Sequence, residues 1–218
     1  MINMAKAQGD IISAVIILII AMGLVGAAYS WGIPLIQKRQ DTAIVNRVLN
    51  YFDQNNVNSL PSMIEYAANH GGEQTFSIDA DGVWTLTPYD EATPFNNSIT
   101  FSFFSKVSNF ATGLAPDEWI SLTSGANCSA SRGTVGTHKA STVCARADSV
   151  ANGYNITYKV LFRELYESSG AKGYKINLVK HESSPKTSTG RSMRISLQDV
   201  KYSEQSNLIE TTIKILLG

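Results

Sequence analysis

Hydrophobic and polar residues divide the chain into an apolar N-terminal segment and a longer part of mixed character. From Ile11 to Gln37 the sequence carries no charged residue and is apolar almost throughout. An apolar run of about 20 residues is long enough to cross the hydrocarbon core of a bilayer as a helix. The run ends at the polar residues QKRQD.

After this run, apolar residues recur at the spacing of an amphipathic helix, at Ile44, Val45, Val48, Leu49 and Phe52. The pattern predicts one helix over about Asp10–Phe52, which at 1.5 Å per residue is about 65 Å long. Pro34 removes a backbone donor, so we expect a kink or local melting near Gly32–Pro34. A short second helix is predicted after Pro61, and the pair Gly71-Gly72 ends it.

The rest of the chain has the alternation of β-strands. The predicted strands are Thr75–Asp79, Val83–Thr87, Ser98–Phe104, Tyr154–Phe162, Tyr174–Leu178, Met193–Leu197 and Ile209–Leu217. The residues Ala80-Asp81-Gly82 predict a hairpin between the first two strands. A polar loop, Ser183–Ser192, is expected on the surface. The fold class is therefore α+β: a long apolar helix followed by a mostly antiparallel β-rich head.

Composition narrows the classes of function. Lys and Arg number 18 and Asp and Glu number 18, so the net charge is zero. Nucleic-acid binding, which needs clustered cations, is not expected. Asp79 and Asp81 form an Asp-x-Asp-Gly fragment, but the further ligands of a calcium loop are missing, which favours turn chemistry over a metal site. We expect no metal and no cofactor.

Three interpretations of the apolar run compete. A secretory signal peptide would use Ile11–Met22 as its hydrophobic region and be cut near Gly26–Ala28. The apolar run continues through Trp31 and Ile36, which a signal peptide does not need. A single-span membrane anchor is the second interpretation. In the third interpretation the chain is cleaved before its apolar run, so the helix stays on the mature protein.

The third interpretation rests on Lys6-Ala7-Gln8, a basic residue, a small residue and a polar residue directly before the apolar run. This arrangement resembles the class III signal of archaeal type IV pilins and archaellins. The resemblance implies that a prepilin peptidase cuts between Ala7 and Gln8. The resemblance covers the whole helix, whereas the head resembles the family only in its general pattern of strands. Bacterial pilins carry Glu where this chain has Ile12, which separates it from the bacterial branch.

The resemblance divides the chain into a leader over residues 1–7, a helix over 8–53 and a β-rich head over 54–218. It implies that copies of the chain form a homopolymer around a core of their N-terminal helices. The residues expected in that core are Ile11, Ile12, Val15, Ile16, Leu18, Ile19, Met22 and Leu24. In part of the family the head is an immunoglobulin-like sandwich. The expected location is an extracellular filament, with the subunit in the membrane before assembly.

Two cysteines and three glycosylation sequons fit an exported chain. Cys128 and Cys144 are the only cysteines, and in an oxidising compartment such a pair is expected to form a disulfide. Two buried free thiols or a redox pair are the alternatives. The sequons begin at Asn96, Asn127 and Asn155. Asn155 lies on the polar phase of its predicted strand, where a glycan would point to solvent.

No motif of a known catalytic class occurs in the sequence, so an enzyme is not expected. The histidines, at positions 70, 138 and 181, are assigned to the surface. The adjacent carboxylates Asp117 and Glu118 are assigned to a turn. The aromatic residues Phe101, Phe103, Phe104 and Phe110 are assigned to the core.

The sequence therefore predicts a structural subunit of an adhesive archaeal type IV-like pilus with a glycosylated head. The leading alternative is a membrane-anchored surface protein whose head binds a ligand or partner. A minor pilin lies between the two. A secreted enzyme comes third.

Overall fold

The computed structural model describes residues 4–90, 96–112, 115, 118–129, 132–170, 172–204 and 206–218, with side chains from residue 13 onward. The chain divides into two compact units, Met1–Thr42 and Ala43–Gly218. The described part of the first unit is helical, and the strands of the described residues all belong to the second unit.

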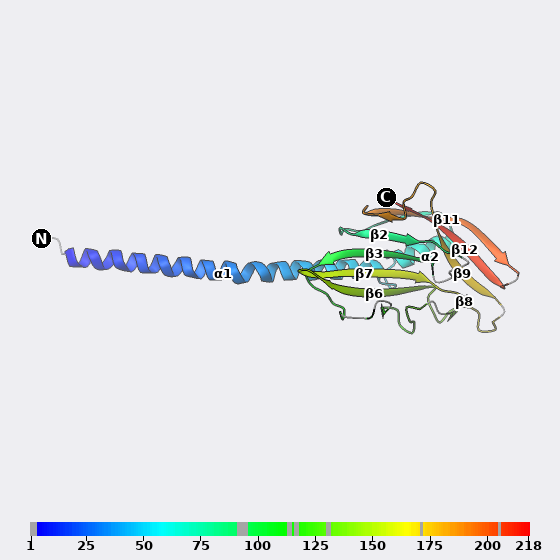
Figure 1. Ribbon diagram of the computed structural model, residues 1–218, viewed down its shortest axis with the longest axis horizontal. Helices are drawn as coiled ribbons and strands as arrows, with labels where there is room; N and C mark the ends of the chain where they lie inside the picture. Colours follow the sequence, from blue (N-terminus) through cyan, green and yellow to red (C-terminus); the bar gives the residue numbers. More distant parts are fainter. Residues whose placement is uncertain are drawn as a thin grey trace. The chain divides into compact units, whose positions relative to one another are not determined.

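Helix α1 (Met4–Phe52) confirms the long helix predicted from the sequence and extends it toward the N-terminus. The local melting expected near Gly32–Pro34 does not occur, because the helix continues through Pro34 without a break (Figure 1). A proline removes only one backbone hydrogen bond, here the one to the carbonyl of Ser30. The helical bonds of the neighbouring turns are sufficient to hold this segment.

Helix α2 (Leu60–His70) ends at the predicted glycine, and it begins one residue before Pro61, with Ser59 as its N-cap. The Ser59 hydroxyl accepts a hydrogen bond from the backbone N–H of Ser62 at 3.4 Å, and Pro61 lies in the first turn. At the other end Gly71 has a φ of 76°, and its N–H donates to the carbonyl of Ala67. Leu60, Ile64 and Ala67 form its buried face.

In the described residues the strands form two six-stranded sheets. The first sheet has the order β1 (Glu73–Ser77), β11 (Ser192–Ser203), β12 (Leu208–Leu217), β9 (Gly173–Lys180), β8 (Leu165–Tyr166) and β5 (Gly133–Thr134). The second has the order β10 (Thr187–Ser188), β2 (Val83–Thr87), β3 (Ser98–Ser105), β7 (Gly153–Phe162), β6 (Ser141–Val150) and β4 (Ile120–Ser121). The α+β class is confirmed.

The head departs from the immunoglobulin-like sandwich that the resemblance implies. In such a sandwich two antiparallel sheets pack directly face to face. Here β12 pairs with β9 in parallel, and α2 packs against β1, β11 and β12 of the first sheet and against β6 of the second. Helix α2 therefore packs against strands of both sheets.

The predicted hairpin around Asp81-Gly82 is wrong, although both of its strands exist. Strand β1 pairs with β11 in the first sheet, and β2 pairs with β3 and β10 in the second. A two-residue hairpin turn needs positive φ angles, and among the described residues neither Asp81 nor Gly82 has one. Ile78 is buried, and its N–H bonds to the carbonyl of Arg191, so the segment after β1 crosses between the sheets.

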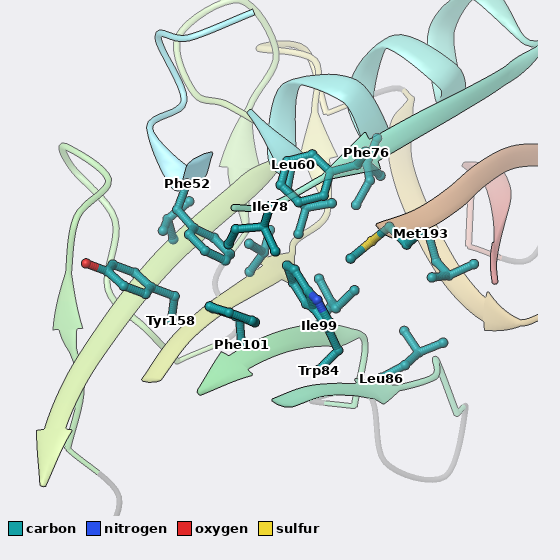
Figure 2. Close-up of a cluster of buried hydrophobic side chains, with 14 of the residues drawn as sticks. Phe52, Leu60, Phe76, Ile78, Trp84, Leu86, Ile99, Phe101, Tyr158 and Met193 are labelled. Carbon is teal, nitrogen blue, oxygen red and sulfur yellow. The ribbon is translucent and has the colours of Figure 1, made fainter. Parts of the chain in front are cut away.

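Aromatic side chains from α1 and from both sheets form the centre of the core. The ring of Phe52, at the end of α1, stacks on Tyr158 at 4.8 Å between centroids and lies 6.3 Å from Phe101. Figure 2 shows Phe52 beside these second-sheet rings, with Leu60, Phe76 and Met193 completing the cluster. The core therefore fixes the last turns of α1 within the head.

A buried asparagine also joins the two sheets. The Asn97 amide nitrogen donates to the carbonyl of Ile176 at 2.6 Å, and its amide oxygen accepts from the N–H of Leu178 at 2.8 Å. A further bond at 3.4 Å runs from the same nitrogen to the carbonyl of Phe162 in β7. These bonds satisfy backbone groups that would otherwise be unpaired in the interior.

Candidate functional site: the apolar helix and the head surface

The apolar part of α1 exposes its large hydrophobic side chains on every side. Successive residues from Val15 to Ile20 are between 50% and 67% exposed. Because each residue turns about 100° around a helix axis, six consecutive exposed residues cover the whole circumference. A continuous exposed apolar surface of this kind marks contact with a membrane or with other chains.

The predicted core positions Val15, Ile16, Leu18, Ile19, Met22 and Leu24 are all exposed in the chain by itself. Ile17 and Ile20, which are not among the predicted core positions, are equally exposed. The side chains of Ile11 and Ile12, and those of the predicted cleavage pair Ala7 and Gln8, lie outside the described side chains. The surface available for contact is therefore a full cylinder.

The length of the apolar segment matches a bilayer. From Ile11 to Trp31 a helix is about 31 Å long, close to the thickness of about 30 Å of a hydrocarbon core. Tyr29 and Trp31 are strongly exposed, and aromatic side chains of this kind are enriched at membrane–water interfaces. By length and composition α1 is able to span a membrane, and N-terminal signal sequences meet the same criterion.

The glycines of this segment have no packing role within the chain. A Cβ placed on Gly23, Gly26 or Gly32 meets no atom within 4 Å. Gly23 and Ala27 lie four residues apart, as do Ala28 and Gly32, so each pair places two small residues on one side of the helix, and the two pairs lie on different sides. Small residues of this spacing permit close approach of a second helix in an apolar environment.

The last turns of α1 belong to the head. Val45, Val48 and Phe52 are fully buried, which confirms these positions of the predicted apolar stripe, whereas Ile44 is exposed. Asn46 accepts a hydrogen bond from the amide of Asn109 at 2.9 Å. The stripe therefore ties the helix to the core through packing and adds polar contacts at its edges.

The Asp79–Asp81 segment is held by arginines. Arg47 of α1 bonds to Asp79 at 2.8 Å, and Arg191 bonds to Asp81 at 2.6 Å. Two guanidinium groups already neutralise these carboxylates, which disfavours a bound cation at this site. The ion pairs support the interpretation of the segment as a connection and fix it against α1 and the start of β11.

A partly buried ion pair lies on the first sheet. Lys175 of β9 is buried, and its ammonium group bonds to Glu164 at 3.1 Å and lies 4.2 Å from the ring centroid of Tyr89. Burial alone would raise the pKa of Glu164, but the hydrogen bond and charge of Lys175 outweigh it and lower the pKa. Burial would lower the pKa of Lys175, but Glu164 and Tyr89 raise it. Neither Lys175 nor Glu164 lies in a motif that would identify this pair from the sequence.

We expect Glu164→Gln to destabilise the head by about 3 kcal/mol, because it leaves the buried Lys175 charge without its carboxylate partner. The lowered pKa of Glu164 makes its contribution complete above the unfolded value of about 4.3, and it is lost as pH falls through the folded value. The raised pKa of Lys175 makes its contribution complete below about 10.4, and it is lost as pH rises further. Urea denaturation of both proteins across pH measures this difference.

A stability difference between wild type and Glu164→Gln that is flat from about pH 5 to 9 and shrinks outside this range agrees with the ion pair. Glu167→Gln is the matched control, since the Glu167 carboxylate accepts a hydrogen bond from the neutral Tyr174 hydroxyl. A difference of the same size in the control would contradict the assignment.

Cys128 and Cys144 form a disulfide, as the sequence predicts, with their Cα atoms 5.9 Å apart. Cys144 lies on β6 and is fully buried, whereas Cys128 lies in the loop before β5. The bond therefore attaches a loop rich in Gly, Ser and Thr to the second sheet. A redox role is disfavoured by the burial of Cys144.

Replacing both cysteines, as Cys128→Ser with Cys144→Ala, is expected to destabilise the head by about 3 kcal/mol, the chain-entropy value for a loop of this size. Thermal denaturation with and without a reductant tests this. The reductant should lower the midpoint of the wild type toward that of the double variant and leave the variant unchanged. Equal midpoints for the two oxidised proteins would refute the stabilising role.

The three sequons differ in their surroundings. Asn96 is half-buried and is followed by the buried residues Asn97 and Ser98. Asn127 is exposed, but its amide oxygen accepts a hydrogen bond from Ser129 at 2.8 Å, and Cys128 is in the disulfide. Asn155 is exposed on β7, as the polar phase of that strand predicts. Asn155 is therefore the most accessible sequon.

The histidines serve local structure. His70 ends α2 and stacks on Tyr66, with 4.4 Å between ring centroids. His138 Nδ1 accepts from the N–H of Thr134 at 3.0 Å, and His181 Nδ1 accepts from the N–H of Ser183 at 3.1 Å. No group of three or more His, Cys, Asp or Glu residues with metal-binding geometry occurs among the described residues.

The remaining predicted residues have mixed outcomes. Phe101 and Phe103 are buried and Phe110 packs against the core, but Phe104 is 54% exposed, so its assignment to the core is wrong. Phe104 points outward because it follows the inward-facing Phe103 on the same strand. Glu118 lies outside the strands, and Asp117 is not among the described residues.

A hollow of about 340 Å³ lies between α2, the segment Val135–Ala140 and β9. Two of its ionisable groups are engaged in folding contacts: Glu65 accepts from the N–H and hydroxyl of Ser141 at 2.9 and 2.6 Å, and Lys175 bonds to Glu164. The first contact fixes α2 to β6, and the second fixes β9 to the segment before β8.

Comparison of the chain with protein-family models, curated proteins and solved structures found no significant match in any of the three.

Proposed function

We propose that this chain is a structural subunit of an extracellular archaeal type IV-like filament, which polymerises through its N-terminal helix and displays a β-rich head for adhesion. The observation that carries the proposal is the continuous apolar surface of residues 15–36, exposed on all sides of a helix whose last turns are buried in a folded head. The class III type of signal at Lys6-Ala7-Gln8 supports it.

The proposed mechanism is assembly without catalysis. The subunit is first held in the membrane by its helix, and a prepilin peptidase cuts between Ala7 and Gln8. Helices then leave the lipid and pack against one another in the filament core. Moving the helices from lipid to the filament core changes the hydrophobic free energy little, because lipid tails are as apolar as leucine. Close packing of the helices, and energy coupled to assembly, must therefore drive the transfer. Small residues such as Gly23 and Ala27 favour such packing.

Two features of the head are typical of extracellular proteins. The disulfide stabilises it, and exposed sequons provide attachment points for glycans. The second candidate function is a membrane-anchored surface protein or a minor pilin, which the match between the Ile11–Trp31 segment and a bilayer favours.

The position of the mature N-terminus separates these functions. Mass spectrometry of the chain from sheared cell-surface material should find Gln8 as the first residue, with the helix retained. A chain that begins near Ala28 would mean ordinary secretion and would overturn the proposal. An uncut chain that stays in the membrane fraction would favour the anchor.

Substitution before the cleavage site sharpens the test. Lys6→Glu should block cleavage and leave the precursor in the membrane, because it removes the basic residue of the signal. Lys38→Glu, the same charge change after the apolar run, is the matched control and should leave cleavage intact.

A further inference from the structure

The outer face of the second sheet carries an exposed aromatic residue directly beside a sequon. In the β3–β7 register Phe104 is paired with Asn155, and Ser102 with Thr157. Paired residues on neighbouring strands point to the same face, so Phe104 and Asn155 are adjacent on the solvent side. Val83 of β2 is paired with Ser102 and is also exposed.

The position of the Phe104 ring is fixed by a glycine. A Cβ on Gly153 would lie 2.7 Å from the ring carbon Cζ of Phe104, so the ring lies against the β7 backbone two residues before Asn155. Only glycine leaves room for the ring in this position. The ring is therefore held against β7 on the face of the sheet that carries Asn155.

A shallow hollow of about 600 Å³ extends from this ring. It is lined by Val83, Ser102, Phe104, Asn155 and Thr189, with Asp81 at its edge. The surface thus combines an aromatic face and a valine with hydroxyl groups. Aromatic faces carry partial negative charge and attract C–H groups of positive polarity, such as those on the face of a sugar ring.

The Asn155 amide is free for modification. Among the described residues no side chain or backbone group bonds to it, in contrast to Asn127, whose amide oxygen is engaged by Ser129. In the folded head the Thr157 hydroxyl lies 2.9 Å from that of Ser102, so the hydroxyl of the sequon is already engaged. Modification therefore has to precede the pairing of β7 with β3.

We propose that Asn155 carries an N-linked glycan whose first sugars lie on Phe104 and Val83 and cover this apolar patch. In the transfer, the amide nitrogen of Asn155 attacks the anomeric carbon of an oligosaccharide linked to a polyprenyl phosphate or diphosphate. The new C–N bond replaces the C–O bond to phosphate, the lipid phosphate leaves, and the nitrogen releases one proton to the transferase. This inference rests on the export of the head in the proposed function, and not on polymerisation.

Sugars that cover the apolar patch should change the stability of the head. Sugars held on Phe104 by their attachment to Asn155 lose little additional freedom on contact, because the covalent bond has already positioned them. The glycan should therefore stabilise the head, and the stabilisation should require the ring. A second copy of the chain is the other occupant that fits an exposed apolar patch, and the experiment distinguishes the two.

The test uses full-length chain from sheared cell-surface material. Glycopeptide mass spectrometry should find Asn155 occupied, and Asn155→Gln should lower the thermal midpoint by about 2–4 °C, the shift for a contact of ordinary size in a domain of this length. Asn127→Gln is the matched control. In a Phe104→Ala background, Asn155→Gln should cause no further shift.

Three results would overturn the inference: an unoccupied Asn155, an effect of Asn155→Gln that persists without Phe104, or a patch that joins copies. In the last case Phe104→Ala would weaken filaments while Asn155→Gln leaves the midpoint unchanged. The outcome is separate from that of the proposed function. A chain that begins at Gln8 with a bare Asn155 rejects only the glycan, and an occupied Asn155 on a chain that begins near Ala28 rejects only the filament.

Discussion

Replacing Leu18 with aspartate is expected to reduce incorporation of the chain into filaments by about 100-fold or more. Leu18 lies in the middle of the apolar segment and is 56% exposed in the single chain. An aspartate at the centre of an apolar helix costs about 3 kcal/mol, and each factor of ten in an equilibrium corresponds to about 1.4 kcal/mol. In a filament the same charge would recur in every subunit, so each contact between neighbouring helices would carry this free-energy cost.

The measurement is the amount of chain in the sheared filament fraction relative to the membrane fraction, by immunoblot. Membrane insertion should survive, since the remaining isoleucine and leucine residues outweigh one aspartate in the sum over the segment. Leu18→Met is the matched control, because it keeps the volume and apolar character of the side chain. Equal incorporation of Leu18→Asp and wild type would show that this helix does not lie in a filament core.

Phe52→Ala is expected to destabilise the head by about 3–5 kcal/mol. The Phe52 side chain is 1% exposed, stacks on Tyr158 and lies near Trp84 and Phe101, so its removal leaves a cavity at the centre of the core. The partner rings lie on β2, β3 and β7 of the second sheet, where strand pairing prevents them from collapsing into the space. Removing the Phe52 ring also removes a packing contact between the end of α1 and the rest of the head.

Urea denaturation of the full chain in detergent micelles, followed by near-ultraviolet circular dichroism, measures this effect. Tyr66→Ala is the matched control, since Tyr66 is an aromatic residue that is half exposed on α2, and it should change stability by no more than about 0.5 kcal/mol. A loss below about 1 kcal/mol for Phe52→Ala would mean that the aromatic cluster does not hold the end of α1.

Local patterns predicted elements of this chain that depend on one segment alone. The uncharged run after Asp10 and the stripe through Val45 and Val48 identified α1, because helix periodicity is a property of the segment itself. The alternation around Tyr158 identified β7 for the same reason. The accessible side of β7, and with it the exposure of Asn155, followed directly from that alternation.

Features that depend on distant segments were not predictable. Strand β6 was missed because it combines Ser, Thr, Ala, Arg and Asp, and it is a strand because β7 pairs with it along its length. The hairpin at Asp81-Gly82 failed because Ile78 enters the core between the sheets and directs β1 and β2 to different partners. Local turn chemistry does not contain this information.

Most of the contacts described on the head surface also depend on distant segments and were not predictable. The ion pair of Lys175 with Glu164 joins residues of β9 and the segment before β8, and neither residue lies in a recognisable motif. The adjacency of Phe104 and Asn155 arises from the β3–β7 register, which the sequence does not specify. Sequons and cysteines, in contrast, are visible as short motifs, which is why those residues were identified in advance.

Electron cryomicroscopy of filaments sheared from the cell surface tests the central claim most directly. The account predicts a core of closely packed helices built from residues 11–36 of many copies, with β-rich heads on the outside and the chain beginning at Gln8. Filaments that lack this chain, or a chain found only in the membrane with its helix in the bilayer, would contradict it.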